Sequence, residues 1–367
     1  MPAPPRSDRT KVLVLYTELA PYVLACLNAW VEAYPVEVHL VRWPVNQEAP
    51  FELRYHPNVH VHERGTFDDA ELLSLAERIA PAMVMASGWV DKGYLKVCRT
   101  LKEHGVHTVM TFDTAWRGGA KQWANVLLAR AWMHRTFSHA WVTGRAQAKY
   151  ARLLGFAPDA IRTGFYSADT AHFLRIGDLL MQARTTTWPH RFLCVARYIP
   201  TKGQQLLCDA FAELCYEGQA GDWELWLAGT GELFEQVASS ASGKHPRIRH
   251  LGFKQVNEMD DVLTETGAFV LPSTYEPWGV VVHEHACVGL PMVLSNAVGA
   301  AERFLVEGEN GHRCIAGDKQ DLKSRLRLII TRTDDELRTM GLRSRSLGAA
   351  WSPQAWSITA HELLNGA

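Results

Sequence analysis

Short apolar runs alternate with longer amphipathic stretches over the first 112 residues of the chain. Apolar runs of this length are typical of strands that are buried on both faces of a parallel sheet. The strands are expected at 11–16, 37–43, 59–63, 82–87 and 107–112, and the helices at 21–34, 68–81 and 94–104. Strand and helix in alternation predict a doubly wound α/β domain.

The pattern becomes irregular at 164–190, which we interpret as an inter-domain linker, and then starts again. A second doubly wound domain follows, with strands expected at 191–198, 223–229, 247–253, 267–273 and 291–296. A closing helix is expected after Ser352-Pro353, because proline is favoured in the first turn. The expected parts are therefore 1–172, 173–350 and 351–367, with a ligand at the carboxyl ends of the strands.

Composition and charge argue against several classes of protein. The chain has 367 residues, which favours two domains over one. Lys plus Arg (38) balances Asp plus Glu (39), so no overall charge points to a nucleic-acid partner. Scattered cysteines without a CxxC pair indicate reduced thiols. No apolar signal core or membrane-length run is visible, so we expect a cytoplasmic protein, with peripheral membrane contact left open.

The stretch VARYIPTKGQQ brings Arg197, Lys202 and Gly203 to a strand-to-helix turn. Two cations beside a helix N-terminus suit a diphosphate, although a solvated turn explains them as well. In LAGTGEL, Gly229 and Gly231 let the backbone approach a ligand or another chain segment, or simply form a tight turn.

The stretch STYEPWGVVVHEHACVGLP places Glu276 and Glu284 in a mostly apolar run. Because Pro277 disfavours helix at Glu276, we expect a loop there and a helix from about Gly279, with its first amides facing the site. That helix is apolar nearly all round and therefore buried, so its carboxylate needs hydrogen-bond donors such as sugar or ribose hydroxyls. The alternative is a surface glutamate and a cap.

Two neighbouring features were weighed for other ligands. His283 and His285 point about 200° apart on a helix, so we expect no metal site there. Gly299-Ala300-Ala301, with Glu302, follows a strand and could present amides to an anion or be a structural turn.

The chain carries, in this order, Arg197, Lys202-Gly203, Gly229, Gly231, two glutamates eight positions apart (E-x7-E) and VGAAERFLVEGENGH, and this series resembles the retaining glycosyltransferases of family 4. The resemblance is specific over about 190–320 and weaker before it, where RTGFYSADTAHF supplies Asp169 as a family aspartate. It implies the GT-B fold, in which two Rossmann-like domains face a central cleft and a C-terminal helix crosses back to the N-terminal domain.

The resemblance also implies roles. The N-terminal domain would take the acceptor and the C-terminal domain a nucleotide diphosphate sugar, without metal or other cofactor. Arg197 and Lys202 would hold the diphosphate, Glu284 the ribose and Glu276 the sugar hydroxyls. Gly229 and the amides of Trp278, Gly279 and Val280 would line the donor site. A saccharide or lipid-linked saccharide would be the acceptor, in surface polysaccharide or glycoconjugate synthesis.

Two departures from the family pattern lie in the N-terminal half. The first strand leads into TELAPY, without the usual glycine-rich loop, and Phe112 stands where a histidine is common. Asp113 could take over a catalytic role or cap the next turn, and Arg117 with Gly118-Gly119 follows it.

The segment 130–156 carries cations among aromatic residues. It predicts either a membrane-facing patch or two amphipathic helices with solvated cations, and the second is favoured. Competing functions are a catalytically silent GT-B protein that binds a nucleotide sugar or a partner, and a GT-B epimerase. A GT-B phosphorylase is disfavoured because it needs pyridoxal phosphate and a longer chain.

Overall fold

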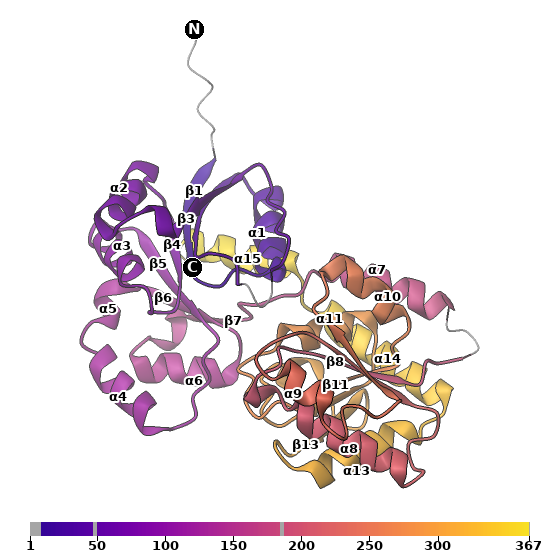
Figure 1. The fold of residues 1–367 in the computed structure, drawn as a ribbon. Helices are drawn as coiled ribbons and strands as arrows, with labels where there is room; N and C mark the ends of the chain where they lie inside the picture. The colour runs from indigo at the N-terminus through magenta and orange to yellow at the C-terminus, as the bar shows by residue number, and fades with distance from the viewer. Residues whose placement is uncertain (1–8, 47–49, 184–186, 367) are drawn as a thin grey trace. The chain divides into compact units, whose positions relative to one another are not determined.

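The computed structural model describes residues 9–46, 50–183 and 187–366, which form two compact units (Figure 1). Unit 1 comprises residues up to 46, 52–167 and 352–367. Unit 2 comprises residues 47–51 and 168–351. Each unit is built on one parallel sheet.

Within the described residues, unit 1 has a seven-stranded sheet in the order β3-β2-β1-β4-β5-β6-β7. Its strands are β1 (Thr10–Tyr16), β2 (Val36–Arg42), β3 (Val59–Glu63), β4 (Met83–Ser87), β5 (His107–Phe112), β6 (His139–Val142) and β7 (Ile161–Thr163). Its helices are α1 (Pro21–Ala33), α2 (Asp69–Ile79), α3 (Lys92–Glu103), α4 (Ala120–Ala129), α5 (Met133–Thr136), α6 (Arg145–Leu154) and α15 (Pro353–Leu364), with 3-10 turns η1 (Arg64–Thr66) and η2 (Pro158–Ala160). Strand order reverses at β1, which pairs with both β2 and β4.

Helix α15 completes unit 1 although it is the last element of the chain. Figure 1 shows it beside α1, and its Trp356 stacks on Trp141 with ring centroids 4.6 Å apart. Trp356 also meets Trp30 edge-on at 6.0 Å and donates from Nε1 to the carbonyl oxygen of Phe165 at 2.6 Å. The expected C-terminal helix that returns to the N-terminal domain is confirmed.

Within the described residues, unit 2 has a six-stranded sheet in the order β10-β9-β8-β11-β12-β13. Its strands are β8 (Arg191–Val195), β9 (Glu224–Ala228), β10 (Ile248–Gly252), β11 (Ala268–Leu271), β12 (Met292–Ser295) and β13 (Gly311–Cys314). Its helices are α7 (Thr170–Ala183), α8 (Gln204–Tyr216), α9 (Phe234–Ser239), α10 (Met259–Thr264), α11 (Val280–Val288), α12 (Ala301–Phe304), α13 (Lys319–Ile330) and α14 (Asp334–Ala349), with 3-10 turns η3 (Pro200–Lys202) and η4 (Val256–Glu258). The order reverses at β8, which pairs with β9 and β11.

Two expectations for local structure were wrong. The supposed linker 164–190 contains α7, whose Phe173, Ile176 and Leu180 are buried in unit 2. The segment 130–156 holds two helices and exposed cations as expected, but the expectation missed β6, which runs between α5 and α6. Its Trp141 and Tyr150 are fully buried core residues and form no surface patch.

Candidate active site

The loop after β8 brings a lysine to the edge of the unit 2 sheet where strand order reverses. Gln204 Nε2 donates to the carbonyl oxygen of Arg197 at 2.7 Å, which fixes the turn into α8. Gly203 has φ +76°, and a Cβ there would lie 2.8 Å from the carbonyl oxygen of Pro272. The turn therefore needs glycine, and it holds Lys202 against the exit of β11. Arg197 lies exposed on the same loop.

Lys202 and Glu276 form an ion pair in the structure. Lys202 Nζ lies 2.5 Å from Glu276 Oε2, and the two side chains are only 15% and 12% exposed. The Thr274 amide donates to the carbonyl oxygen of Thr201 at 2.8 Å, so the two loops are also joined through their backbones. The structure thus brings together two residues for which the sequence predicted separate contacts with the donor.

Helix α11 begins beside this pair. Gly279, its N-cap, has φ +90°, and a Cβ there would lie 3.0 Å from Glu276 Cγ. Among the described residues, the N–H groups of Trp278, Gly279 and Val280 meet no hydrogen-bond acceptor. Open amides at a helix N-terminus next to a lysine can bind an anionic oxygen.

The amides of the loop after β12 are used differently. The Gly299 N–H donates to the carbonyl oxygen of Glu276 at 3.0 Å, and that of Ala300 to Trp278 at 2.9 Å. The Ala301 N–H is bonded to Val298, and a Cβ on Gly299 would lie 2.1 Å from the carbonyl oxygen of Pro277. The anion site considered at 299–301 is therefore wrong: this loop supports the Glu276 loop from behind.

The two glycines after β9 lie against the loop after β8. Gly229 has φ +131°, and a Cβ there would lie 2.1 Å from the carbonyl oxygen of Ala196. Gly231 has φ +146°, and a Cβ there would lie 2.7 Å from that of Tyr198. Close backbone packing accounts for both glycines, so they carry no independent signal for a ligand.

Glu284 lies half-buried on α11, in its second turn. Burial and the Asp169 carboxylate raise the pKa of Glu284 to about 7. Asp169 itself accepts the His172 N–H at 3.2 Å, at the start of α7. Among the described residues no donor is bonded to the Glu284 carboxylate. A half-buried carboxylate of this kind gains from ligand hydroxyls.

The histidines beside Glu284 serve the packing of unit 2. His283 Nδ1 accepts the Ala168 N–H at 3.0 Å, so its other ring nitrogen donates to the carbonyl oxygen of Gly348 at 2.9 Å. His285 stacks on Phe269 with centroids 4.0 Å apart and donates from Nδ1 to Val281 at 2.7 Å. Both imidazoles are thus fixed in the neutral form, and burial lowers the pKa of each to about 4.

These two histidines each make unit 2 less stable in acid, whereas the raised pKa of Glu284 acts in the opposite direction over the same pH range. With folded pKa values of about 4 and unfolded values near 6.5, the unfolded state binds protons that the folded state refuses as pH falls below 6.5. Each histidine should therefore lower the free energy of unfolding by about 2 kcal/mol between pH 6.5 and pH 5, with no effect above pH 7. Urea titrations at several pH values measure this slope. His285→Leu should remove the contribution of one histidine and leave that of Glu284 unchanged, so its loss of stability between pH 6.5 and pH 5 should be smaller than that of the parent by about 2 kcal/mol. The buried Nε2 of His285 has no partner among the described residues that the leucine would leave unpaired. A change of exposed His104 to leucine is the control, and an unaltered slope in His285→Leu would refute the assignment.

Asp113 lies in unit 1, in the loop after β5, whereas the other predicted site residues lie in unit 2. Gln147 Nε2 donates to its carbonyl oxygen at 2.8 Å. Burial, together with the charge of Asp113, raises the pKa values of Tyr16, Tyr22 and Tyr166. Asp113 therefore lies close to tyrosine hydroxyls that sequence reasoning did not single out. Phe112 points into the core, where it meets Tyr150.

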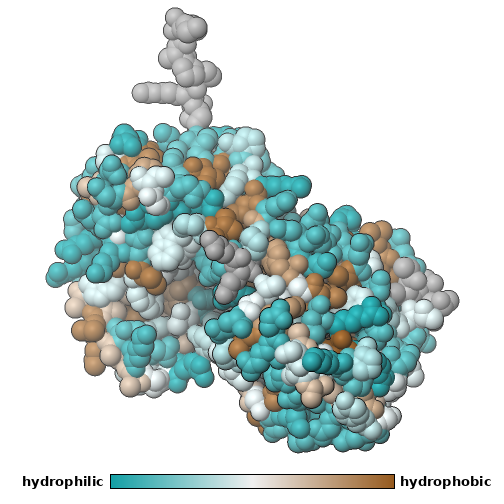
Figure 2. Space-filling model, in the orientation of Figure 1, coloured by the Kyte–Doolittle hydropathy of each residue, from teal (hydrophilic) through white to brown (hydrophobic). Residues whose placement is uncertain are grey.

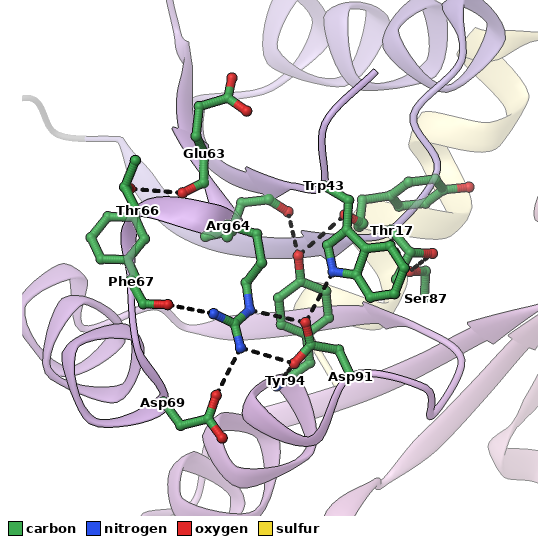
Figure 3. A network of polar contacts seen from close by, with 12 residues as sticks. Thr17, Trp43, Glu63, Arg64, Thr66, Phe67, Asp69, Ser87, Asp91 and Tyr94 are labelled. Carbon is green, nitrogen blue, oxygen red and sulfur yellow. Dashed lines mark hydrogen bonds and ion pairs between the residues drawn. The ribbon is translucent and has the colours of Figure 1, made fainter. Parts of the chain in front are cut away.

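The loop after β1 has no glycine, yet it is well fixed (Figure 3). The Thr17 N–H donates to Ser87 Oγ at 2.9 Å, and the two hydroxyls lie 3.0 Å apart, so the ends of β1 and β4 are joined. In the same figure, Asp91 accepts from Arg64 at 2.9 Å and from Trp43 Nε1 at 3.0 Å. Sequence reasoning missed this network, in which Asp91 is also the N-cap of α3 and accepts the Tyr94 N–H. It ties down the carboxyl edge of the sheet in unit 1.

Comparison with known proteins follows the division into two units. Residues 184–345 match the family model described as glycosyl transferases group 1. The chain is 26% identical over 162 residues to an uncharacterized glycosyltransferase of Methanocaldococcus jannaschii, covering 44% of this chain and 43% of that protein. It is 30% identical over 149 residues to the lipopolysaccharide core biosynthesis glycosyltransferase LpsE of Rhizobium meliloti, covering 40% and 41%. The chain thus spans less than half the length of these relatives.

The fold is shared over the whole chain. The crystal structure of HepE from Anabaena, in complex with UDP and glucose, matches with a TM-score of 0.73 and 17% identity over 98% of this chain and 100% of that one. The GT-B fold expected from the sequence is confirmed. The sequence similarities and the shared fold together support a glycosyltransferase with the GT-B fold.

Proposed function

We propose that the protein is a retaining glycosyltransferase of the family 4 type. It moves a sugar from a nucleotide diphosphate sugar to a saccharide or lipid-linked saccharide acceptor, in the synthesis of surface polysaccharide or another glycoconjugate. One observation carries the proposal: the Lys202–Glu276 pair lies next to the open amides of α11, where strand order in unit 2 reverses. Cation, anion-binding amides and carboxylate at one such edge fit a glycosyl diphosphate.

The diphosphate is the part of the donor that needs positive charge. Lys202 and Arg197 lie on one loop, and the amides of Trp278, Gly279 and Val280 are close to Lys202 through Glu276. As the bond from sugar C1 to the phosphate oxygen breaks, the diphosphate gains charge, and fixed cations stabilise it most at that point. We propose that these groups do so without a metal ion.

The two carboxylates take the hydroxyl groups of the donor. Glu276 contacts the transferred sugar, because its carboxylate is held beside Lys202, which binds the diphosphate. Glu284 accepts from the ribose hydroxyls, which would satisfy a half-buried carboxylate with no donor of its own. Gly229 lines the same edge of unit 2 through its backbone.

The acceptor attacks C1 from the face that the diphosphate leaves, and its hydroxyl proton passes to the departing phosphate oxygen. The configuration at C1 is retained in this scheme. Asp113, in the acceptor unit, orients the acceptor hydroxyl.

The seven cysteines, all free, agree with a cytoplasmic setting.

A catalytically silent GT-B protein is the second candidate, favoured by Phe112 at the position where the family often has a histidine. A GT-B epimerase is the third. A silent protein binds the donor without consuming it, whereas an epimerase converts the donor sugar into its epimer without needing an acceptor. Product analysis with and without acceptor therefore separates the three.

The test is a thermal-shift screen of the whole protein against UDP-, GDP- and ADP-sugars, with Glu284→Ala as the variant. One nucleotide class should stabilise the protein by binding the native state, and Glu284→Ala should weaken that binding about tenfold or more. Stabilisation by none of the three, or unchanged affinity in Glu284→Ala, contradicts the proposal.

A further inference from the structure

Helix α4 turns its apolar side toward solvent. Val126 and Ala129 are buried, whereas Trp123, Leu127 and Leu128 are 50%, 73% and 70% exposed. A surface helix of a globular protein normally presents its large apolar residues to the core. The reversed arrangement is therefore informative, because contiguous exposed apolar surface marks an interaction site.

The exposed side chains form one continuous strip. Trp123 and Leu127 are four residues apart, and so are Ala124 and Leu128, so the two rows run side by side along the helix. Figure 2 shows hydrophobic surface at the outer edge of unit 1 over α4. The strip, which we call the α4 strip, consists of Trp123, Ala124, Leu127 and Leu128.

The strip is held in place from beneath by aromatic rings. Trp123 meets Trp116 edge-on, with centroids 5.1 Å apart, and Trp116 lies 5.5 Å from the ring of Tyr150. Tyr150 is fully buried and packs against Phe112, the last residue of β5. The α4 strip is thus joined to the core of unit 1 by packed aromatic rings. It also follows the Asp113 loop closely in the sequence.

The segment of the chain that carries the strip has charges of one sign. Residues 114–158 contain no aspartate or glutamate, although acids and bases are balanced over the whole chain. The cations of this segment are all exposed: Arg117, Lys121, Arg130, Arg135, Arg145, Lys149 and Arg152. Among the described residues, Lys121, Arg135 and Lys149 take part in no ion pair.

We propose that the α4 strip docks on an anionic lipid surface. An apolar strip flanked by cations without acids is the chemistry of a helix lying in the membrane interface. A second copy of the chain would bring the same cations to the contact and repel. Among the described residues, no helix is both long and apolar enough to cross a bilayer.

Docking there would hold the acceptor unit at the surface in which a lipid-linked acceptor resides. This consequence rests on the proposed function, whereas the docking does not. Donor binding and vesicle binding are separate measurements, so either idea can fail alone.

The test is co-sedimentation of the whole protein with phosphatidylcholine vesicles, with and without phosphatidylglycerol, at low and high salt. We expect binding only to the anionic vesicles, weakened by salt. Leu127→Gln/Leu128→Gln should lower the partition coefficient at least about tenfold, because both side chains lose apolar burial. Lys121→Gln/Arg135→Gln should lower it about fivefold per charge.

Lys92→Gln/Lys96→Gln on α3 is the matched control, since it removes two exposed lysines outside the acid-free segment. It should bind like the parent. Absence of binding to anionic vesicles, or equal binding by Leu127→Gln/Leu128→Gln, overturns the proposal. So does a concentration-dependent dimer that this leucine variant abolishes while vesicle binding persists, because the strip would then be an interface between copies. Melting temperatures of the variants without ligand, equal to that of the parent, show that they are folded.

Discussion

Lys202→Ala should lower kcat/KM for the donor by about two to three orders of magnitude. The reason is twofold. The change removes the cation that meets the developing charge on the diphosphate, and it leaves the Glu276 carboxylate, only 12% exposed, without its partner. The uncompensated negative charge then lies where the diphosphate must bind. Steady-state kinetics with varied donor measure the effect, and calorimetry shows how much of it is binding.

Lys244→Ala is the matched control, because Lys244 is an exposed lysine on another loop of unit 2. It should leave both kinetic constants unchanged. If Lys202→Ala were to keep more than about a tenth of the parent kcat/KM, the proposed charge stabilisation by Lys202 would be excluded.

Glu276→Gln should separate chemistry from nucleotide binding. Turnover should fall about a hundredfold or more, because the amide positions the sugar hydroxyls less well than the carboxylate. The affinity for the nucleoside diphosphate alone should rise about tenfold, because Lys202 is released from its ion pair and a negative charge beside the phosphates is gone. Few substitutions in a binding site strengthen one ligand while weakening catalysis, so the result is distinctive.

Asp261→Asn, which removes an exposed carboxylate on α10, is the control and should change neither quantity. The double variant Lys202→Ala/Glu276→Gln should lose less activity than the two single variants would lose if their effects were additive, since the two residues act as a pair. If Glu276→Gln bound the nucleoside diphosphate more weakly than the parent, the prediction would be wrong. The Lys202–Glu276 ion pair would then not compete with binding of the diphosphate.

The sequence predicted the strands whose own residues demand burial. Runs such as Val12–Leu15 are apolar at every position and lie wholly inside. Strands β6, β7 and β13 escaped prediction because they are short or polar, as in IRT and GHRC. Their conformation is set by pairing with a neighbouring strand. By contrast, α7 was missed although Phe173, Ile176 and Leu180 recur at helical spacing.

In the candidate site, too, some features are set by the local sequence and others by contacts between distant segments. The loop at Glu276 and the helix that begins after Gly279 follow from local pattern. The contact between Lys202 and Glu276 spans 74 residues, and no local pattern encodes it. Whether a loop amide is open or already bonded is also a tertiary property, which is why Gly299 and Ala300 could not be told apart from Trp278 and Gly279 by sequence alone.

The discontinuity of unit 1 bears on how the chain acquires its structure during synthesis. Trp356 fills the space between Trp30 and Trp141, all three of them buried, but it leaves the ribosome only after the whole of unit 2. Until then the nascent unit 1 exposes both tryptophans, whereas residues 168–351 can already close their own core. The first half of the chain is thus the last to mature, and in the interval it is the part that needs protection from aggregation.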